Sequence, residues 1–251
     1  MTIRMRVLAC GALLALSIPA MATQISGSLK IDGKFTVGPT FLNFCDSATV
    51  GACPAAPGNW NPPGLGTGDF SNPYANDPNG GSITNLNSVN APVGTLLPGN
   101  GILVLTFTPS VALPTPDIQL YLTQLLAGVG NPANCTAAPA DGQTCTPAIP
   151  GGSAVTFLNT AGGNSSATVS ANGRARRVST NEFDNLLIVF STTFNTPFQQ
   201  VLSDFNTQGS LTQTYSGTFT ATVVPEPMTM TLIGLGLFAF AALSRRLARK
   251  V

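Results

Sequence analysis

Two apolar segments with opposite charged flanks lie at the ends of the chain and determine the compartment in which the rest must fold. At the start, residues 1–6 contain two arginines and no acid, and the apolar run 7–18 follows. A proline ends this run, and Ala20 and Ala22 supply the small side chains that a signal peptidase reads. The sequence therefore predicts a secretory signal peptide over residues 1–22, cleaved after its last alanine.

The second apolar segment lies near the C-terminus, where residues 228–243 carry no charge. A helix of this length spans about 24 Å, whereas bilayer hydrocarbon is roughly 30 Å thick. The arginines that follow can extend its reach by snorkelling. Four basic residues within 244–251 favour a cytoplasmic C-terminus, which leaves the body of the protein outside. We predict a transmembrane helix over residues 228–244 of the precursor.

A short motif precedes this helix, and a basic cluster follows it. The two prolines of Pro-Glu-Pro lack an amide hydrogen and resist helix formation, so the tripeptide should be extended and accessible beside the membrane. A processing enzyme can bind a segment of this kind. The motif residues and the first arginines of the cluster are Pro225, Glu226, Pro227, Arg245 and Arg246.

The order of motif, apolar helix and arginines resembles the PEP-CTERM sorting signal. This resemblance covers residues 224–251 and implies recognition by a membrane-embedded exosortase that cleaves near the motif. It also implies a Gram-negative bacterium that makes exopolysaccharide. Similar tails carry an ice-binding-protein label as well, which describes the tail and not an activity.

Between these ends, residues 23–223 form a stretch of about 200 residues, enough for one extracellular domain. The chain has eleven basic residues, of which two lie in the signal peptide and four in the tail, so five lie in residues 23–223. Nine of the ten acidic residues also lie in residues 23–223. The net charge of the stretch is therefore 5 minus 9, or −4. Nucleic-acid binding is not expected, because it needs a basic face that neutralises phosphates.

Four cysteines remain after removal of the signal peptide, an even number that suits an oxidising compartment. Three pairings are possible. Proximity and the Pro/Gly/Ala-rich composition of the intervening loops favour the two local pairs. Zinc is not expected, because the chain has no histidine and no Cys-x-x-Cys spacing. The disulfide candidates are Cys45, Cys53, Cys135 and Cys145.

The middle stretch predicts an all-β fold. Apolar residues alternate with polar ones over 25–31 and again over 211–223, where threonines occupy the outward positions. Pro/Gly-rich loops are predicted over 51–100 and 131–152. Many short strands with such turns indicate a single β-sandwich or jelly-roll-like domain.

Three local features refine this prediction. Gly33 is interpreted as a turn after the first strand, and Gly217 as a bulge in the last one. One helix is expected from Phe198, with Thr196 as its cap and Pro197 in its first turn. Residues 117–126 fit a strand and a helix equally well.

Catalytic chemistry finds little support in the sequence. Without histidine, neither a Ser-His-Asp nor a Cys-His nucleophile system can be assembled. No catalytic, cofactor-binding or metal-binding residue is assigned, and no cofactor is expected. Glycoside hydrolysis by a carboxylate pair remains open, because it needs only two acids at a set spacing.

Four further features have alternative interpretations. Residues 77–80 resemble part of a calcium loop but fit an Asx turn better, because calcium wants six or more oxygens. Trp60 either stacks on a sugar or covers a small core. Arg174, Arg176 and Arg177 either meet an anionic polysaccharide or form a solvated hairpin tip. The threonine ladder is one strand, not the array that an ice lattice requires, and predicts a solvent-facing or glycosylated strand.

Together these observations predict an exported, non-enzymatic structural or adhesive protein of the cell surface or exopolysaccharide matrix, anchored in the inner membrane as a precursor. Its expected partners are signal peptidase, an exosortase-like enzyme and extracellular polysaccharide. The alternative is a secreted carbohydrate-active enzyme that uses a carboxylate pair.

Overall fold

Long antiparallel strands dominate the structure. The computed structural model describes residues 24–71, 74, 80–111 and 113–223, all within the compact unit Gln24–Val223. The strands are β1 (Gly27–Val37), β2 (Phe41–Cys45), β3 (Gly58–Trp60), β4 (Gly81–Ile83), β5 (Leu86–Asn87), β6 (Ile102–Phe107), β7 (Ile118–Leu125), β8 (Thr144–Cys145), β9 (Val155–Thr160), β10 (Asn164–Arg177), β11 (Glu182–Phe194) and β12 (Leu211–Thr222). The helices are η1 (Gly68–Phe70), η3 (Pro132–Cys135) and α2 (Phe198–Gln208).

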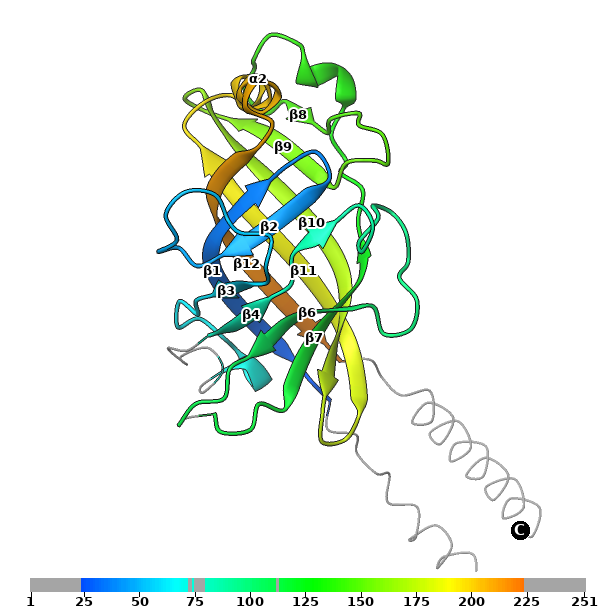
Figure 1. The fold of residues 1–251 in the computed structure, drawn as a ribbon. Helices are drawn as coiled ribbons and strands as arrows, with labels where there is room; N and C mark the ends of the chain where they lie inside the picture. Colours follow the sequence, from blue (N-terminus) through cyan, green and yellow to red (C-terminus); the bar gives the residue numbers. More distant parts are fainter. Residues whose placement is uncertain (1–23, 72–73, 75–79, 112, 224–251) are drawn as a thin grey trace, which may run out of the picture. The chain divides into compact units, whose positions relative to one another are not determined.

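These strands form one 12-stranded sheet, in the order β3-β4-β6-β7-β10-β11-β12-β1-β2-β5, with β9 paired to β10 and β8 to β9. The all-β class is therefore confirmed, but the two-sheet sandwich is corrected to a single curled antiparallel sheet (Figure 1). The physical reason is strand length. Strands of 11 to 14 residues twist and coil strongly, so one sheet wraps around the apolar interior without a second sheet.

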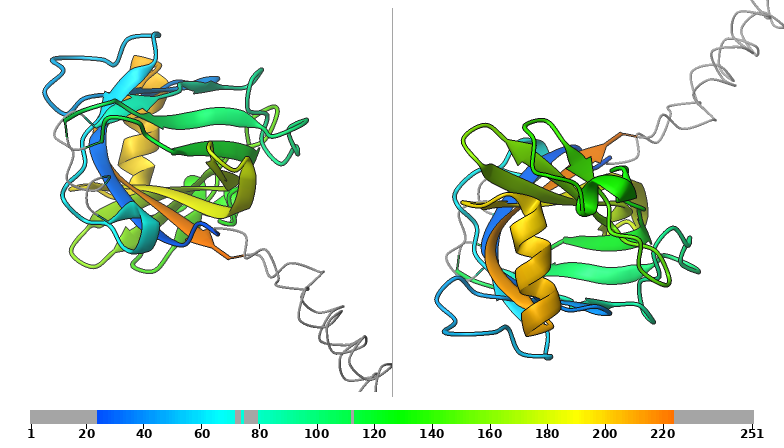
Figure 2. Two further views of the ribbon diagram at one scale, coloured as in Figure 1. Left: turned by 90° about the horizontal axis from the view of Figure 1, so that it is seen from below. Right: turned by 90° about the horizontal axis from the view of Figure 1, so that it is seen from above.

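Strand β1 shows how far the sheet curls. It pairs with β12 along its whole length and with β2 near its end. The segment 61–67, directly after β3, also hydrogen-bonds to β1: the Asp32 amide donates to the Asn61 carbonyl at 2.9 Å, and the Thr67 amide to the Ser28 carbonyl at 2.8 Å. Segments from opposite ends of the strand order therefore meet at β1, and Figure 2 shows the sheet wrapped around its interior when viewed from either end.

The interior is filled by the inward residues of each strand. Alternate positions of β1, β11 and β12 are buried, in agreement with the predicted period of two. Aromatic rings lie at the centre, with the Phe190 ring 5.7 Å from both Phe219 and Tyr215 and 5.1 Å from Phe44. Such pairs add about 0.5–1.5 kcal/mol each beyond their burial.

Two glycines have different roles from those that the sequence suggested. Gly33 is not a turn, because β1 runs through it and pairs it with Tyr215; the chain turns at residues 38–40. Gly217 is not a bulge, because it keeps regular register with Ile31 and Phe190. A Cβ at position 217 would lie 2.8 Å from Ile31 Cγ1. Both glycines instead make room for large inward side chains on neighbouring strands.

Helix α2 covers one end of the curled sheet. Phe198 and Val201 are buried against β9 and β10, so the helix expected from Phe198 is confirmed. The predicted cap is wrong: Pro197 occupies the N-cap position and makes no side-chain hydrogen bond. The Phe198 amide donates instead to Oδ1 of Asn159 on β9, at 2.9 Å. The helix thus begins where a neighbouring strand supplies the acceptor.

Substitution of Gly217 tests the packing interpretation. Gly217→Ala should lower the free energy of unfolding by about 1–3 kcal/mol, because the added methyl overlaps Ile31 and crowds Phe190 at 3.1 Å. Denaturant unfolding measures the change. The matched control is Ser216→Ala, the adjacent outward position, which should change stability by less than about 0.5 kcal/mol. Equal stability of the two variants would contradict the interpretation.

Candidate functional site: a hydroxyl-lined groove

The outward face around β12 is rich in hydroxyl groups, and the strand register extends this character to neighbouring strands. Ser216 lies opposite Ser191 of β11 on one side and Asp32 of β1 on the other. Ser191 in turn lies opposite Thr168 of β10. The polar face is therefore wider than the single strand that the sequence suggested. The outward residues of β12 itself are Thr214, Ser216, Thr218, Thr220 and Thr222.

A groove opens on this face where β11 and β12 separate. Their ladder ends at the pair Ser191 and Ser216, although both strands continue beyond it. Past this point the Thr192 hydroxyl donates to the Thr214 carbonyl at 2.7 Å. The groove encloses about 420 Å³. Its lining residues are Asp32, Gly33, Ser47, Ser191, Thr192, Thr193, Thr214, Tyr215 and Ser216.

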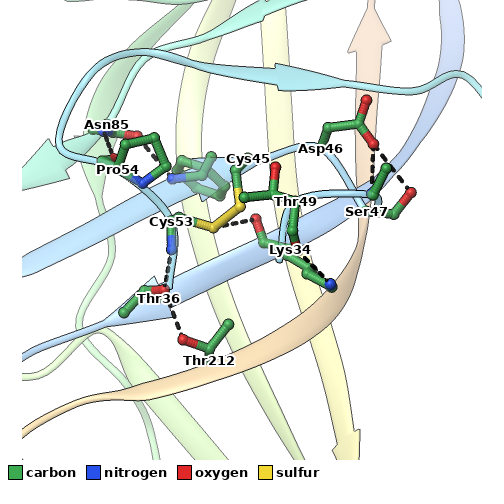
Figure 3. Close-up of a disulfide and its surroundings, with 12 residues drawn as sticks. Lys34, Thr36, Cys45, Asp46, Ser47, Thr49, Cys53, Pro54, Asn85 and Thr212 are labelled. Carbon is green, nitrogen blue, oxygen red and sulfur yellow. Dashed lines mark hydrogen bonds between the residues drawn. A yellow bond between two sulfur atoms is a disulfide. The ribbon is translucent and has the colours of Figure 1, made fainter. Parts of the chain in front are cut away.

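The first disulfide holds one wall of the groove. Cys45 and Cys53 are bonded, with their Cα atoms 5.4 Å apart, and the loop between them folds back beside β1 (Figure 3). The Cys53 amide donates to Thr36 Oγ1 at 2.7 Å, and Lys34 Nζ donates to the Thr49 carbonyl at 2.7 Å. These contacts fix a loop that brings Ser47 to the groove.

Asp46 organises the start of this loop (Figure 3). Its Oδ1 accepts hydrogen bonds from the Ala48 amide at 2.8 Å and from Asn61 Nδ2 at 3.1 Å. The bond from Ala48 is the main reason why the pKa of Asp46 lies below its usual value; partial burial opposes the shift, and Asn61, Ser47 and the charge of Lys34 support it. The carboxylate is therefore ionised at neutral pH and ties the loop to the segment after β3.

Tyr215 lies beneath the groove. Its side chain is 4% exposed, and its hydroxyl has no hydrogen-bond partner in the described part of the chain. Burial, together with the negative charge of Asp32, raises the pKa of Tyr215 far above its usual value. The phenol therefore stays neutral and cannot serve as a base at physiological pH. Its ring is too buried to act as a stacking surface for a sugar.

The sugar-stacking interpretation of Trp60 is wrong. The side chain is 1% exposed, its Nε1 donates to the Thr106 carbonyl at 3.3 Å, and its ring lies edge-on to Phe107 at 5.5 Å. Trp60 is a core residue on the short strand β3. A sequence cannot distinguish the two roles, because the residues around Trp60 are polar in either case.

The arginine cluster lies at the end of β10, and two of its members have structural partners. Arg177 contacts Asp69 at 2.8 Å and Asp117 at 3.5 Å. Burial would raise the pKa of Asp117, but hydrogen bonds from Ser179 and the charge of Arg177 lower it overall. Arg176 lies over the Phe183 ring at 5.9 Å. Arg177 thus connects η1 to the segment just before β7.

The remaining predicted sites divide between described and undescribed residues. Cys135 and Cys145 form the second disulfide, with Cα atoms 5.2 Å apart, so both pairs are local. Of the calcium-like segment 77–80, only the last residue is described. Within the described residues, no group of three or more His, Cys, Asp or Glu side chains is placed to hold a metal ion.

Comparison with known proteins gives one result, and it concerns the tail. Residues 223–246 match the family described as the PEP-CTERM protein-sorting motif. The chain carries a PEP-CTERM protein-sorting motif. This motif indicates an exported protein that is targeted by an exosortase and crosses a membrane on its route. No curated protein and no solved structure matches the chain.

The PEP-CTERM residues themselves, from Pro225 to Arg246, lie outside the described part of the chain, as do the predicted cleavage alanines Ala20 and Ala22. The predicted transmembrane helix 228–244 lies outside it too. Among the residues that the structure describes, no helix combines the length and apolar character needed to cross a membrane.

Acid titration tests the role of Asp46. Its lowered folded-state pKa means that its contribution to stability is present above the unfolded pKa of about 3.9 and is lost as the pH falls through the folded value. Asp46→Asn should therefore cost about 1 kcal/mol near neutral pH, and this cost should decrease progressively as the pH falls below about 3.9. Denaturant unfolding at several pH values measures this. Asp141→Asn, an exposed loop acid, is the control; a cost independent of pH would contradict the prediction.

Proposed function

We propose that this exported protein is a non-enzymatic adhesive component of the cell surface or exopolysaccharide matrix and that it binds polysaccharide in the groove between β11 and β12. The observation that carries the proposal is the lining of the groove, which combines serine and threonine hydroxyls with one carboxylate, Asp32. The PEP-CTERM motif supports the export route.

The chemistry of the groove suits a neutral polyhydroxylated ligand. Each serine or threonine hydroxyl both donates and accepts, as does each hydroxyl of a sugar. Asp32 adds a charged acceptor, which strengthens the hydrogen bonds that it receives. Among the residues that the structure describes, no exposed aromatic ring lines the groove, so we expect a single site to bind weakly. Many copies on one surface would convert weak binding into firm adhesion to a repeating polymer.

The acids with shifted pKa values favour binding over hydrolysis. A glycoside hydrolase needs a general acid whose pKa is raised. The pKa values of Asp46 and Asp117 are both lowered, and Asp117 shares the Arg177 guanidinium with Asp69. These two carboxylates are held ionised as structural acceptors, so neither has the raised pKa of a general acid.

Affinity electrophoresis in gels containing exopolysaccharide purified from the producing bacterium tests the proposal. Asp32→Asn and Thr214→Val should each weaken retention about tenfold, because each removes a hydrogen-bonding group from the groove. Thr220→Val is the matched control: it makes the same change on the same strand, outside the groove, and should leave retention unchanged.

Two results would decide against this function. Retention that is unchanged in both groove variants would remove the groove as the binding site. Release of reducing sugar from the same polysaccharide, abolished by substitution of one acid, would establish the enzyme instead.

A further inference from the structure

A patch of arginine and aromatic side chains lies on the outer face of the sheet, where β7, β10 and β11 pair. In this part of the three strands, buried residues alternate with residues that point away from the core. Arg174 of β10 lies opposite Tyr121 of β7, and Arg176, two positions further on, lies opposite Phe183 of β11. These four side chains share the outer face, and we call them the arginine–aromatic patch.

The two rings of the patch are only partly buried and lie near each other. The ring centres of Tyr121 and Phe183 are 6.2 Å apart, and their planes meet at 57°. Neither ring belongs to the buried core of the described residues. They offer apolar surface beside polar groups, which suits a ligand with one apolar and one polar side. A sugar ring is of this kind, because its CH groups form a face and its hydroxyls an edge.

Contacts within the protein hold the patch in place. Cζ of Arg176 lies 5.9 Å from the centre of the Phe183 ring. Its Nε donates to Asn181 Oδ1 at 3.0 Å, and its Nη1 donates to Gln119 Oε1 at 3.3 Å. The Tyr121 hydroxyl donates to the same Gln119 oxygen at 2.9 Å. Both rings are therefore oriented before a ligand arrives, which lowers the cost of binding.

Arg174 differs from its neighbours because its charge has no counter-ion. Its side chain is exposed, and within the described residues no hydrogen bond or ion pair engages it. The two acids at this end of the strands have other partners: Asp117 pairs with Arg177, and Glu182 accepts a hydrogen bond from the Thr180 hydroxyl. The patch is thus a positively charged surface that is complementary to an anionic ligand.

We propose that the arginine–aromatic patch is a second sugar-binding site, which takes the uronate units of an acidic extracellular polysaccharide. A guanidinium and a carboxylate can form two parallel hydrogen bonds, and this pairing assigns the uronate carboxylate to Arg174. The sugar ring then covers Tyr121 or Phe183. Nucleic acid fits less well, because it needs a broad basic face, whereas five basic and nine acidic residues give residues 23–223 a net charge of −4.

This site is separate from the hydroxyl-lined groove. Phe183 of the patch and Ser191 of the groove lie eight positions apart on β11, which corresponds to about 27 Å along the strand. The two sites also differ in chemistry, because the groove offers hydroxyls and a carboxylate, whereas the patch offers a cation and aromatic rings. The proposal therefore does not depend on the function proposed for the groove.

Affinity electrophoresis of the exported protein, purified from producing cells, tests the patch in gels that contain polygalacturonate, a polymer of uronate units. Arg174→Gln should weaken retention about tenfold, because it removes the charged donor for the carboxylate. Tyr121→Leu should weaken it about threefold, because the ring face is lost while apolar bulk remains. Lys30→Gln is the matched control: it removes one positive charge from an exposed position of β1 and should change retention less than twofold.

Three results would overturn the proposal. Equal losses in Arg174→Gln and Lys30→Gln would show that diffuse surface charge, and not the patch, attracts the polymer. Tighter binding of a single-stranded polynucleotide than of polygalacturonate would make the patch a nucleic-acid site. Free migration of the wild type through the polygalacturonate gel would remove the site altogether. The result is read separately from that of the groove, because Asp32→Asn and Thr214→Val change no residue of the patch.

Discussion

The antiparallel pairing of the first strand with the last holds this structure together. β1 and β12 stay in register over eleven residue pairs, from Gly27 opposite Ala221 to Val37 opposite Leu211. This contact joins segments almost two hundred residues apart in the chain. It lets one sheet curl around the core, and it places both ends of the unit Gln24–Val223 next to each other. The outward residues of the two strands also form the floor of the polar groove.

The two disulfides of the structure are consistent with an exported protein. An oxidising compartment allows the two local disulfides, and each holds a loop that lacks regular structure. The Cys45–Cys53 bond does more than close its loop, because Lys34 and Thr36 hold the same loop beside β1. The groove therefore has one wall made by a disulfide loop and another made by separating strands. Contacts between segments distant in the chain determine the shape of the groove. The serine and threonine hydroxyls that line it determine its chemistry.

The sequence predicted local structure where a single periodicity dominated. The alternation over 211–223 gave the correct inward and outward faces of β12, and the helix expected from Phe198 forms over Phe198–Gln208. Prediction from the sequence failed where contacts with a neighbouring strand decided the structural role of a residue or segment. Residues 117–126 fit two patterns and became a strand because β6 and β10 pair with Ile118–Leu125. The sequence predicted a turn at Gly33. In the structure, Gly33 instead leaves space for the ring of Tyr215, which comes from near the other end of the chain.

The sequence by itself determined the all-β class, the exported character and the sorting motif, because charge, apolar length and alternation act over short stretches of chain. It also named the cysteines and favoured the pairs that form. Only the tertiary structure decided that Trp60 is core, that Arg177 is held by two acids, and that Asp32, Ser191 and Ser216 share one groove. Each of those facts depends on strand register and sheet curvature, which are set by the packing of side chains from distant segments and leave no local trace in the sequence.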